Sequence, residues 1–415
     1  MKNILEKKCV LCNESFELET SFLTCPKCGE EGILDFVYDY DFIKDHYLKS
    51  VSESPRPDIW RYSALLPVTE AKFFTKTLIG PTPLIKSERL SSYTGIRNLY
   101  IKDDGRLPTA SYKDRASALA IGSAKSLGIN LICAASTGNA AASLAGLTAP
   151  EGIRSVIFVP ASAPPAKLAQ LATFGALVHA VDGTYDDAFA LSLKASSKFG
   201  WYLRSTAVNP VLSEGKKTGA FEMAEQTGYG NLPETVFVSV GDGCIIGGIA
   251  KGFIDLYSAG IIKNMPRVIG VQAEGSCVIH DAFHLGTEKI TVKEPTTRAD
   301  SISVGFPRDY IKALRNVKTT GGTYVKVTDE EIFKSSYLLG SYEGVFAEPA
   351  GATAFAGVLK ALETGIIDKN TSCGVFITGN GLKDVAGSSM AAPAAVKIPR
   401  GEAALDVIEN LFKTK

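Results

Sequence analysis

Short apolar segments alternate with longer helical segments along most of the chain beyond residue 97. The apolar segments are rich in Val, Ile and Phe and fall at 98–104, 130–136, 155–160, 176–181, 235–241, 267–275 and 372–381. Alanine-rich or amphipathic segments follow at 114–128, 139–149, 166–175, 186–200, 245–260 and 348–365. Strands that are apolar on both faces, each followed by a helix, are typical of parallel sheets covered by helices. The pattern therefore predicts an α/β fold with ligand sites at the carboxyl ends of strands.

Residues 41–80 do not follow this alternation. An acidic and aromatic stretch leads into Ser-Pro-Arg-Pro-Asp-Ile-Trp-Arg-Tyr-Ser-Ala-Leu-Leu-Pro, which contains three prolines. Prolines at this density break regular elements, so the segment is predicted to be a linker that docks on the rest of the protein.

Composition narrows the class of protein. The chain has 415 residues, 45% hydrophobic and 21% charged, which predicts two or three globular domains and excludes intrinsic disorder. Lys plus Arg equals Asp plus Glu, 44 against 44, so the basic excess of a nucleic-acid or anionic-membrane binder is absent. No apolar run reaches the ~20 residues needed to span a bilayer. Lysines and a glutamate occupy the place of a secretory apolar region, which predicts a cytoplasmic enzyme.

Four of the eight cysteines form two Cys-x-x-Cys pairs, Cys9 with Cys12 and Cys25 with Cys28, separated by twelve residues. Two tight turns of this kind bring four thiolates to the corners of a tetrahedron, the geometry that Zn²⁺ prefers. A segment of about forty residues has little core of its own, so a structural zinc would supply its folding free energy. Two exposed redox pairs, or a ribbon that has lost its metal, are the alternatives. Core positions are expected for the remaining Cys133, Cys244, Cys277 and Cys373.

Three loops between a strand and a helix carry candidate chemistry. The first contains Lys113, whose amine at a helix start would have a lowered pKa, as an imine-forming lysine requires. The second, Ser136-Thr137-Gly138-Asn139, offers successive backbone N–H groups to a carboxylate, although a helix cap explains part of it. The third is a glycine-rich phosphate cradle at Gly241, Asp242, Gly243, Cys244 and Ile245. It lacks the third glycine at the spacing of a dinucleotide site.

Together, these motifs resemble a known family. The order SYKDR, STGN, glycine-rich loop, EPAGA and TGNGLKD over roughly residues 56–385 resembles the pyridoxal-phosphate enzymes of the tryptophan synthase β fold. Within that group the chain is most similar to the threonine synthases, some of which carry a four-cysteine ribbon. The resemblance implies that Lys113 forms the imine with pyridoxal phosphate and carries protons, and that Asn139 contacts the pyridine O3′. It further implies that residues 136–138 bind the substrate carboxylate and that residues 241–245 bind the cofactor phosphate. Thr378 would place a hydroxyl near the pyridine nitrogen. A hydroxyl there favours elimination and replacement over transamination.

The resemblance also implies an organisation. Residues 1–40 would form the zinc ribbon, 41–114 and 206–400 the larger cofactor-binding domain, 115–205 a smaller α/β domain and 401–415 a C-terminal helix. The implied partners are a small amino-acid substrate and a second copy of the chain in a homo-oligomer, with neither nucleic acid nor membrane.

The chain departs from threonine synthases where they hold the phosphate of O-phosphohomoserine. Where the family has a threonine, this chain has Ala140, and where the family has a serine it has Ala207. Leu212 stands at the position of a family arginine, and Ile245 at that of an asparagine in the glycine loop. Loss of an arginine removes a bidentate phosphate donor. We therefore expect low activity on this substrate that depends on Lys216 or Lys217, and a gain from Leu212→Arg with Ala207→Ser.

Three hypotheses follow. The first is a threonine synthase, and the second is an elimination or replacement enzyme such as a serine or threonine dehydratase, whose substrate lacks a phosphate. The third is a zinc-ribbon interaction protein with an inactive enzyme fold, which the intact Lys113 and Asn139 disfavour.

Overall fold

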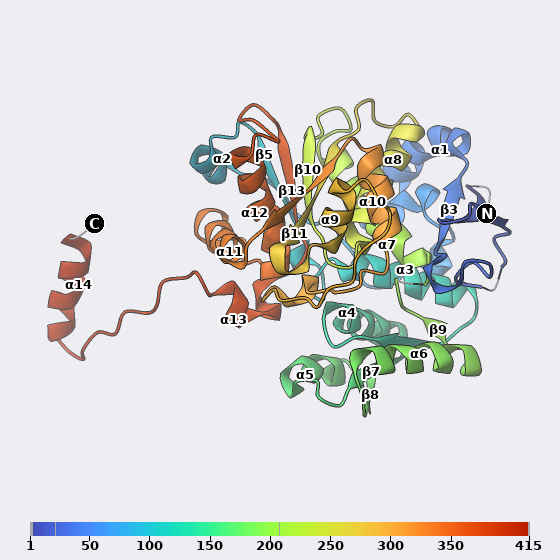
Figure 1. Ribbon diagram of the computed structural model, residues 1–415, viewed down its shortest axis with the longest axis horizontal. Helices are drawn as coiled ribbons and strands as arrows, with labels where there is room; N and C mark the ends of the chain where they lie inside the picture. The colour runs from blue at the N-terminus through green and yellow to red at the C-terminus, as the bar shows by residue number, and fades with distance from the viewer. Residues whose placement is uncertain (1–2, 21, 207, 414–415) are drawn as a thin grey trace.

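The computed structural model describes residues 3–20, 22–206 and 208–413, and the sheets in this part of the chain are three (Figure 1). The strands are β1 (Ile4–Cys9), β2 (Ser15–Phe16), β3 (Leu34–Tyr38), β4 (Leu84–Lys86), β5 (Leu99–Asp103), β6 (Leu131–Ala135), β7 (Arg154–Pro160), β8 (Leu177–Val181), β9 (Tyr202–Leu203), β10 (Thr235–Ser239), β11 (Arg267–Ala273), β12 (Thr323–Val327) and β13 (Cys373–Ile377). Each apolar segment expected to be a strand overlaps one of them, so the predicted α/β class is confirmed.

The largest sheet has six strands in the order β12-β11-β10-β13-β5-β4, all parallel except β4, which is antiparallel to β5. Both of its faces are buried. On β10, for example, Val236 and Val238 belong to one apolar cluster and Phe237 belongs to another. One face carries α3 (Lys113–Ser126), α7 (Val211–Gln226), α8 (Cys244–Ser258), α9 (Val278–His284) and α10 (Tyr310–Thr319); the other carries α2 (Glu88–Thr94), α11 (Asp329–Glu343) and α12 (Pro349–Glu363).

A four-stranded parallel sheet, β8-β7-β6-β9, forms a separate layer beneath the larger sheet in Figure 1. Its helices are α4 (Asn139–Thr148), α5 (Pro165–Thr173) and α6 (Tyr185–Phe199). Thr184 begins α6 with a reciprocal capping box to Asp187, which satisfies backbone N–H groups at the helix start. The sequence-based expectation of two parallel sheets is therefore met.

The N-terminal segment forms the small antiparallel sheet β2-β1-β3 and then α1 (Tyr40–Glu53). Residues 41–80 contain more structure than the linker prediction allowed. Ile43, Tyr47 and Val51, spaced by four, bury one face of α1, and Asp39 caps it by accepting from the Phe42 N–H. The docking part of that prediction fits the buried Trp60, whose Nε1 donates to Thr75 Oγ1 at 3.0 Å.

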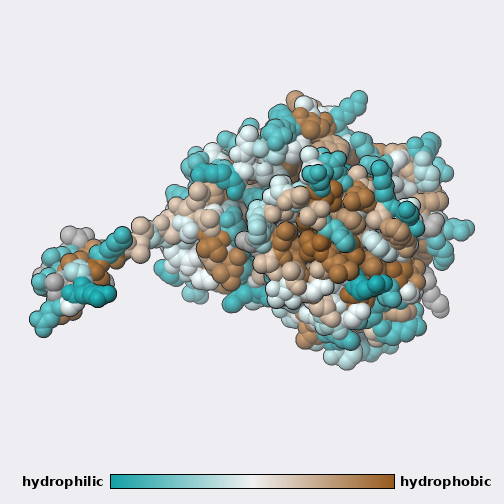
Figure 2. Space-filling view, turned by 90° about the horizontal axis from the view of Figure 1, so that it is seen from below, coloured by the Kyte–Doolittle hydropathy of each residue, from teal (hydrophilic) through white to brown (hydrophobic). Residues whose placement is uncertain are grey.

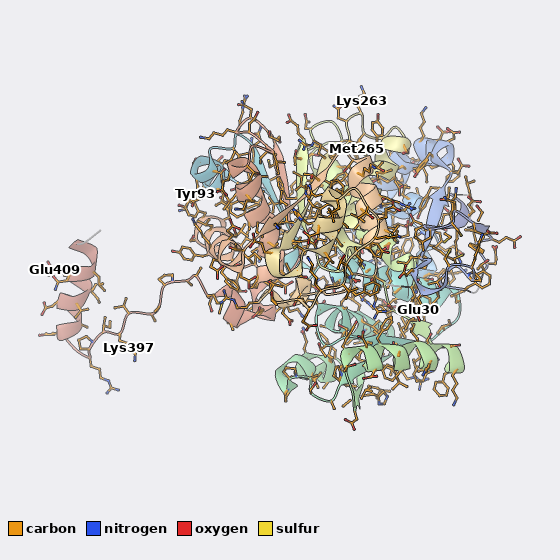
Figure 3. All side chains as sticks on the ribbon, in the orientation of Figure 1. Glu30, Tyr93, Lys263, Met265, Lys397 and Glu409 are labelled. Atoms are coloured by element: carbon orange, nitrogen blue, oxygen red, sulfur yellow. The ribbon has the colours of Figure 1, made fainter. Side chains whose placement is uncertain are left out.

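The C-terminal end leaves the body of the molecule. After α13 (Val385–Ser388), an extended segment that includes Lys397 leads to α14 (Ala403–Lys413), which carries Glu409 and stands apart from both sheets (Figures 2 and 3). None of the described helices has the length and apolarity that a membrane span requires.

A buried carboxylate joins the main elements of the larger sheet. Glu222 on α7 accepts from Arg115 of α3 at 2.7 and 2.9 Å and from Lys102 of β5 at 2.7 Å. Asp104, just after β5, accepts from Arg115 at 2.7 Å. Arg115, Lys102 and Glu222 are at most 1% exposed, so this network lies out of water. It fixes α3 and α7 against the sheet.

We predict that Glu222→Gln lowers the free energy of unfolding by about 3–5 kcal/mol, because it leaves Arg115 and Lys102 buried with too little negative charge. Denaturant unfolding of the purified protein measures this. Glu363→Gln is the matched control, since its surface pair with Lys360 is worth no more than about 1 kcal/mol. Equal stability of the two variants would contradict the role assigned to Glu222.

Candidate active site

Four loops that follow strands carry the predicted site residues. Lys113 begins α3 after β5, and Asn139 begins α4 after β6. The glycine-rich loop joins β10 to α8, and Thr378 follows β13 directly. Because β5, β10 and β13 are parallel neighbours, three of these loops leave the same edge of the larger sheet. The fourth comes from the smaller sheet.

The residues before Lys113 are tied to the loop after β13. Ser111 forms a β-bridge with Gly379, and the Tyr112 N–H donates to the Thr378 carbonyl at 2.9 Å. Tyr112 Oη also donates to the Lys216 carbonyl of α7 at 2.6 Å. Backbone contacts on both sides therefore set the position from which Lys113 projects.

The Lys113 amine lies in a site of mixed charge. Burial lowers its pKa, and the nearby Arg204 cation lowers it further, whereas Glu348 and Asp242 act in the opposite direction. A lysine with a lowered pKa holds more of the neutral, nucleophilic amine at neutral pH. This is the chemical state that bond formation to a carbonyl carbon requires.

Asn139 connects the smaller sheet to the larger one. Its Nδ2 donates to both Glu348 carboxylate oxygens, at 3.0 and 3.1 Å, and the Glu348 N–H donates to the Gly379 carbonyl at 3.1 Å. Burial raises the pKa of Glu348 to about 7, although the Asn139 bonds act to lower it. Sequence reasoning quoted Glu348 only as part of a motif and assigned it no role.

Ser136, Thr137, Gly138 and Asn139 are half-buried at the start of α4. Ser136 Oγ accepts from the Gly138 N–H at 3.2 Å, which shapes the turn. A Cβ placed on Gly138 would lie in open space, so the helix start borders room for a ligand. The first N–H groups of a helix have no partner within it and suit an anion.

The glycine-rich loop has the backbone of a phosphate cradle. Gly243 has φ +86°, and a Cβ there would lie 2.9 Å from the Asp309 carbonyl oxygen, so a side chain does not fit. The Asp242 carboxylate is held by two hydrogen bonds, one from the loop itself and one from the Arg308 backbone. Its Oδ1 accepts from the Arg308 N–H at 2.6 Å and its Oδ2 from Cys244 Sγ at 3.0 Å. The N-terminus of α8 is thus left to a phosphate.

Lys216 and Lys217, which were expected to compensate for the missing phosphate donors, lie in different surroundings. Lys217 Nζ pairs with Glu214 at 2.5 Å and Asp255 at 2.7 Å, inside the protein. Lys216 projects to the active-site side, with Nζ donating to Thr206 Oγ1 at 2.9 Å. Leu212 is fully buried in the main apolar cluster, so Leu212→Arg would place a charge in the core, and Ala207 lies outside the described residues.

Arg204 is a site residue that sequence reasoning missed. It follows β9 and is 5% exposed, and its Nε donates to Ser117 Oγ on α3, one turn beyond Lys113. An arginine just after a strand is usually exposed, but this one is buried against α3, a helix of the larger sheet. No pattern in the sequence signals that burial.

The four N-terminal cysteines converge. Their Sγ atoms all lie within 4.8 Å of one another, and Cys12 Sγ is 3.8 Å from Cys25 Sγ. A tetrahedral Zn–S₄ site with bonds of about 2.3 Å needs sulfur separations of about 3.8 Å. The set therefore fits a zinc ion. The other four cysteines are buried, as expected for core residues.

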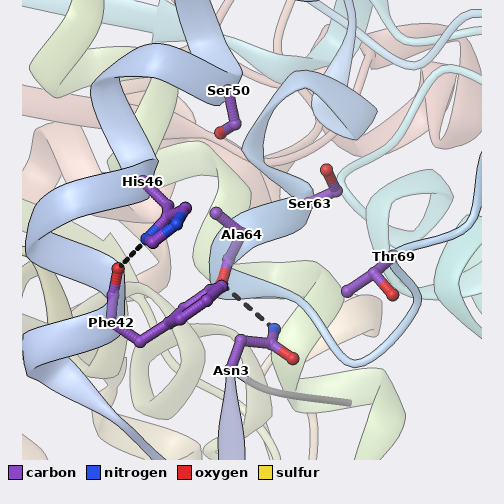
Figure 4. A pocket seen from close by; sticks show the side chains of 7 residues that line it. All are labelled: Asn3, Phe42, His46, Ser50, Ser63, Ala64 and Thr69. Atoms are coloured by element: carbon purple, nitrogen blue, oxygen red, sulfur yellow. Dashed lines mark hydrogen bonds between the residues drawn. The ribbon is translucent and has the colours of Figure 1, made fainter.

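A cavity of about 220 Å³ lies elsewhere, between α1 and the 59–65 segment (Figure 4). Its lining includes Phe42, His46 and Asn3, whose Nδ2 donates to the Ala64 carbonyl at 3.0 Å. None of the predicted site residues lines it.

Comparison with known proteins gives the same family as the motifs. The family model described as "Pyridoxal-phosphate dependent enzyme" matches residues 75–379. A threonine synthase of Methanocaldococcus jannaschii is 36% identical over 409 residues, which cover 98% of this chain and 99% of that one. A threonine synthase of Mycobacterium leprae is 34% identical, over 88% of this chain and 98% of its own.

Solved structures share the fold at lower identity. A threonine deaminase from Solanum lycopersicum superposes with a TM-score of 0.65 at 21% identity, over 84% of this chain and 94% of that one. A maize serine racemase gives a TM-score of 0.62 at 18% identity, over 81% and 94%. At these identities the likeness extends to the fold alone.

Glu348 makes the stability of the cofactor-free protein depend on pH. Its pKa is about 7 in the folded protein and near 4.3 in an unfolded chain, so its contribution is complete at low pH and is lost as pH rises toward and through 7. We predict that the unfolding free energy of wild type relative to Glu348→Gln falls by about 3 kcal/mol between pH 4 and 8. Denaturant unfolding of both proteins across that range measures the difference. Parallel pH profiles would contradict a buried, protonated Glu348.

Proposed function

This chain belongs to the pyridoxal-phosphate dependent enzymes and, within them, to the threonine synthase family, and we propose that it converts O-phospho-L-homoserine and water into L-threonine and phosphate. The observation that carries this proposal is near-full-length similarity to threonine synthases, joined to a Lys113 placed among the loops that suit the cofactor and an amino-acid carboxylate. The enzyme is accordingly a carbon–oxygen lyase acting on a small molecule.

The residues fit pyridoxal phosphate, which when bound supplies an electron sink that acidifies the substrate Cα–H. The start of α8, with Gly243 at its head, would hold the phosphate, and Lys113 Nζ would hold the carbonyl carbon. Asn139 would contact the ring O3′ while Glu348 holds its amide group, and Thr378 would lie near the pyridine nitrogen. Ser136, Thr137 and Gly138 would bind the substrate carboxylate. When free, the Lys113 amine is the base that accepts and returns protons at substrate carbon atoms.

We also propose a structural role for the ribbon. Cys9, Cys12, Cys25 and Cys28 would hold one Zn²⁺ and stabilise the small sheet, which docks on the enzyme through Lys251 Nζ and the Phe36 carbonyl at 3.1 Å. We propose the same domain boundaries as the sequence analysis, namely 1–40, 41–114 with 206–400, 115–205 and 401–415. Each of the three sheets falls within one of these parts. The cytoplasmic location and homo-oligomer stay predictions.

Substrate screening tests the reaction. Purified holoenzyme is expected to release phosphate from O-phospho-L-homoserine and to form threonine in equal amount. Formation of a 2-oxo acid from L-serine or L-threonine, without phosphate release from O-phospho-L-homoserine, would instead support the dehydratase alternative.

Lys113→Ala is expected to abolish turnover and the visible absorbance of the bound cofactor, because no other amine replaces the one that holds it. Borohydride reduction of the wild type followed by peptide mapping should label Lys113. Lys125→Gln, at the far end of the same helix, should retain both properties. A label on another lysine would contradict the assignment.

Cys9→Ser is expected to remove about one equivalent of zinc per chain and to lower thermal stability, because metal binding contributes folding free energy to a small ribbon. Turnover at low temperature should change far less than stability. Metal analysis checks this, with Cys277→Ser as the control outside the ribbon. A metal-free wild type with an ordered ribbon would contradict the proposal.

A further inference from the structure

Two buried cations, Arg204 and Lys216, lie near Lys113 and are not needed to hold the cofactor as proposed. Arg204 follows β9 of the smaller sheet, and Lys216 lies on α7 beneath the larger one. They are 5% and 1% exposed. The Lys216 stem packs against Gly248, in the second turn of the helix whose start forms the phosphate cradle.

Neither cation has a carboxylate at ion-pair distance within the described residues, although Asp114 acts to raise the pKa of Arg204 and Asp309 that of Lys216. Arg204 Nη2 is buried without a hydrogen-bond partner there, and its Nε bonds only the neutral Ser117 hydroxyl at 3.2 Å. Lys216 Nζ bonds the neutral Thr206 hydroxyl at 2.9 Å. In contrast, the neighbouring Lys217 has two carboxylates within 2.7 Å.

Buried charges without counter-ions are costly, so a site of this kind is completed by an anion. The pKa values of the two cations agree with their burial and lack of ion pairs. Burial lowers the pKa of Arg204 to about 10 and that of Lys216 to about 8, and the Lys113 and Arg204 charges add to the effect on Lys216. These three cations therefore share one region.

The cofactor supplies one phosphate, for which the start of α8 is already built. A phosphorylated substrate brings a second dianion, and neither Ala140 nor the buried Leu212 offers a side-chain donor to it. Resting on the proposed function, we propose that Arg204 and Lys216 bind the phosphate group of the substrate. Arg204 can present its Nη2 from the smaller sheet, and Lys216 its ammonium from α7. The proposed donors therefore stand at other positions than the replaced side chains: Lys216 is about one turn beyond Leu212 on α7, and Arg204 follows β9.

Binding of inorganic phosphate to the holoenzyme, measured by titration calorimetry, tests this without turnover. Arg204→Gln and Lys216→Gln should each weaken phosphate binding by about ten- to a hundredfold, the effect of losing one charge-assisted hydrogen bond. Arg204→Lys, which keeps the charge, should recover part of the affinity. Arg267→Gln, which removes a positive charge at the opposite end of β11, should bind as wild type does.

Cofactor affinity of the same variants separates the two phosphates. Near-wild-type affinity for pyridoxal phosphate with weakened inorganic phosphate binding supports the proposal. Loss of cofactor affinity alone, or unchanged phosphate binding in both Gln variants, overturns it. Because neither cation is paired, the cofactor-free Gln variants should be at least as stable as wild type, which excludes misfolding as the cause.

Measurement of kcat/KM on O-phospho-L-homoserine tests this inference separately from the proposed reaction. If wild type turns over O-phospho-L-homoserine, kcat/KM should fall in the Gln variants by the factor seen for phosphate, and an unchanged kcat/KM overturns the inference alone. If wild type does not act on that substrate but the variants still lose phosphate binding, the reaction is wrong and the anion site stands.

Discussion

The Glu222 carboxylate is the buried charge on which the arrangement of the larger sheet depends. It lies on α7 and receives hydrogen bonds from Arg115 on α3 and Lys102 on β5, so three elements distant in sequence share one anion. Lys113 is two residues from Arg115, and Lys216 is two turns from Glu222 on the same helix. The relative positions of the two active-site amines therefore follow from a network that takes no part in the chemistry.

The buried cations of the active-site region are balanced differently from those of the Glu222 network. In the Glu222 network, Lys102 and Arg115 pair with carboxylates. Among the described residues, by contrast, the side chains of Arg204 and Lys216 donate to the hydroxyl groups of Ser117 and Thr206. Glu348, which accepts from Asn139, has a pKa raised by burial to about 7 and is largely protonated at mildly acidic pH. We therefore expect the phosphate groups of the ligands to supply the charge that balances Arg204 and Lys216.

The α/β class and the strands beyond residue 97 follow from hydrophobic patterning, because strands buried on both faces must be apolar. The candidate site residues that lie in recognisable motifs, from Lys113 to Thr378 along the chain, were predicted from the sequence. The helix α1 was missed although Ile43, Tyr47 and Val51 are spaced for one face, since nearby prolines dominated the interpretation. Arg204 could not be found, because its burial arises where the two sheets meet and has no local signal.

Lys216 and Lys217 are adjacent in sequence but point about 100° apart around α7. Lys216 reaches the Thr206 hydroxyl, whereas Lys217 reaches the buried carboxylates of Glu214 and Asp255. Mutation at the two positions therefore meets different kinds of selection. We expect replacement of Lys217 to be penalised wherever the fold is kept, because it leaves Glu214 and Asp255 buried without their shared cation. If Lys216 binds the substrate as proposed, position 216 is expected to change when the substrate changes. In a set of diverging relatives, residue 216 would record the history of substrate choice while its neighbour records only the history of the scaffold.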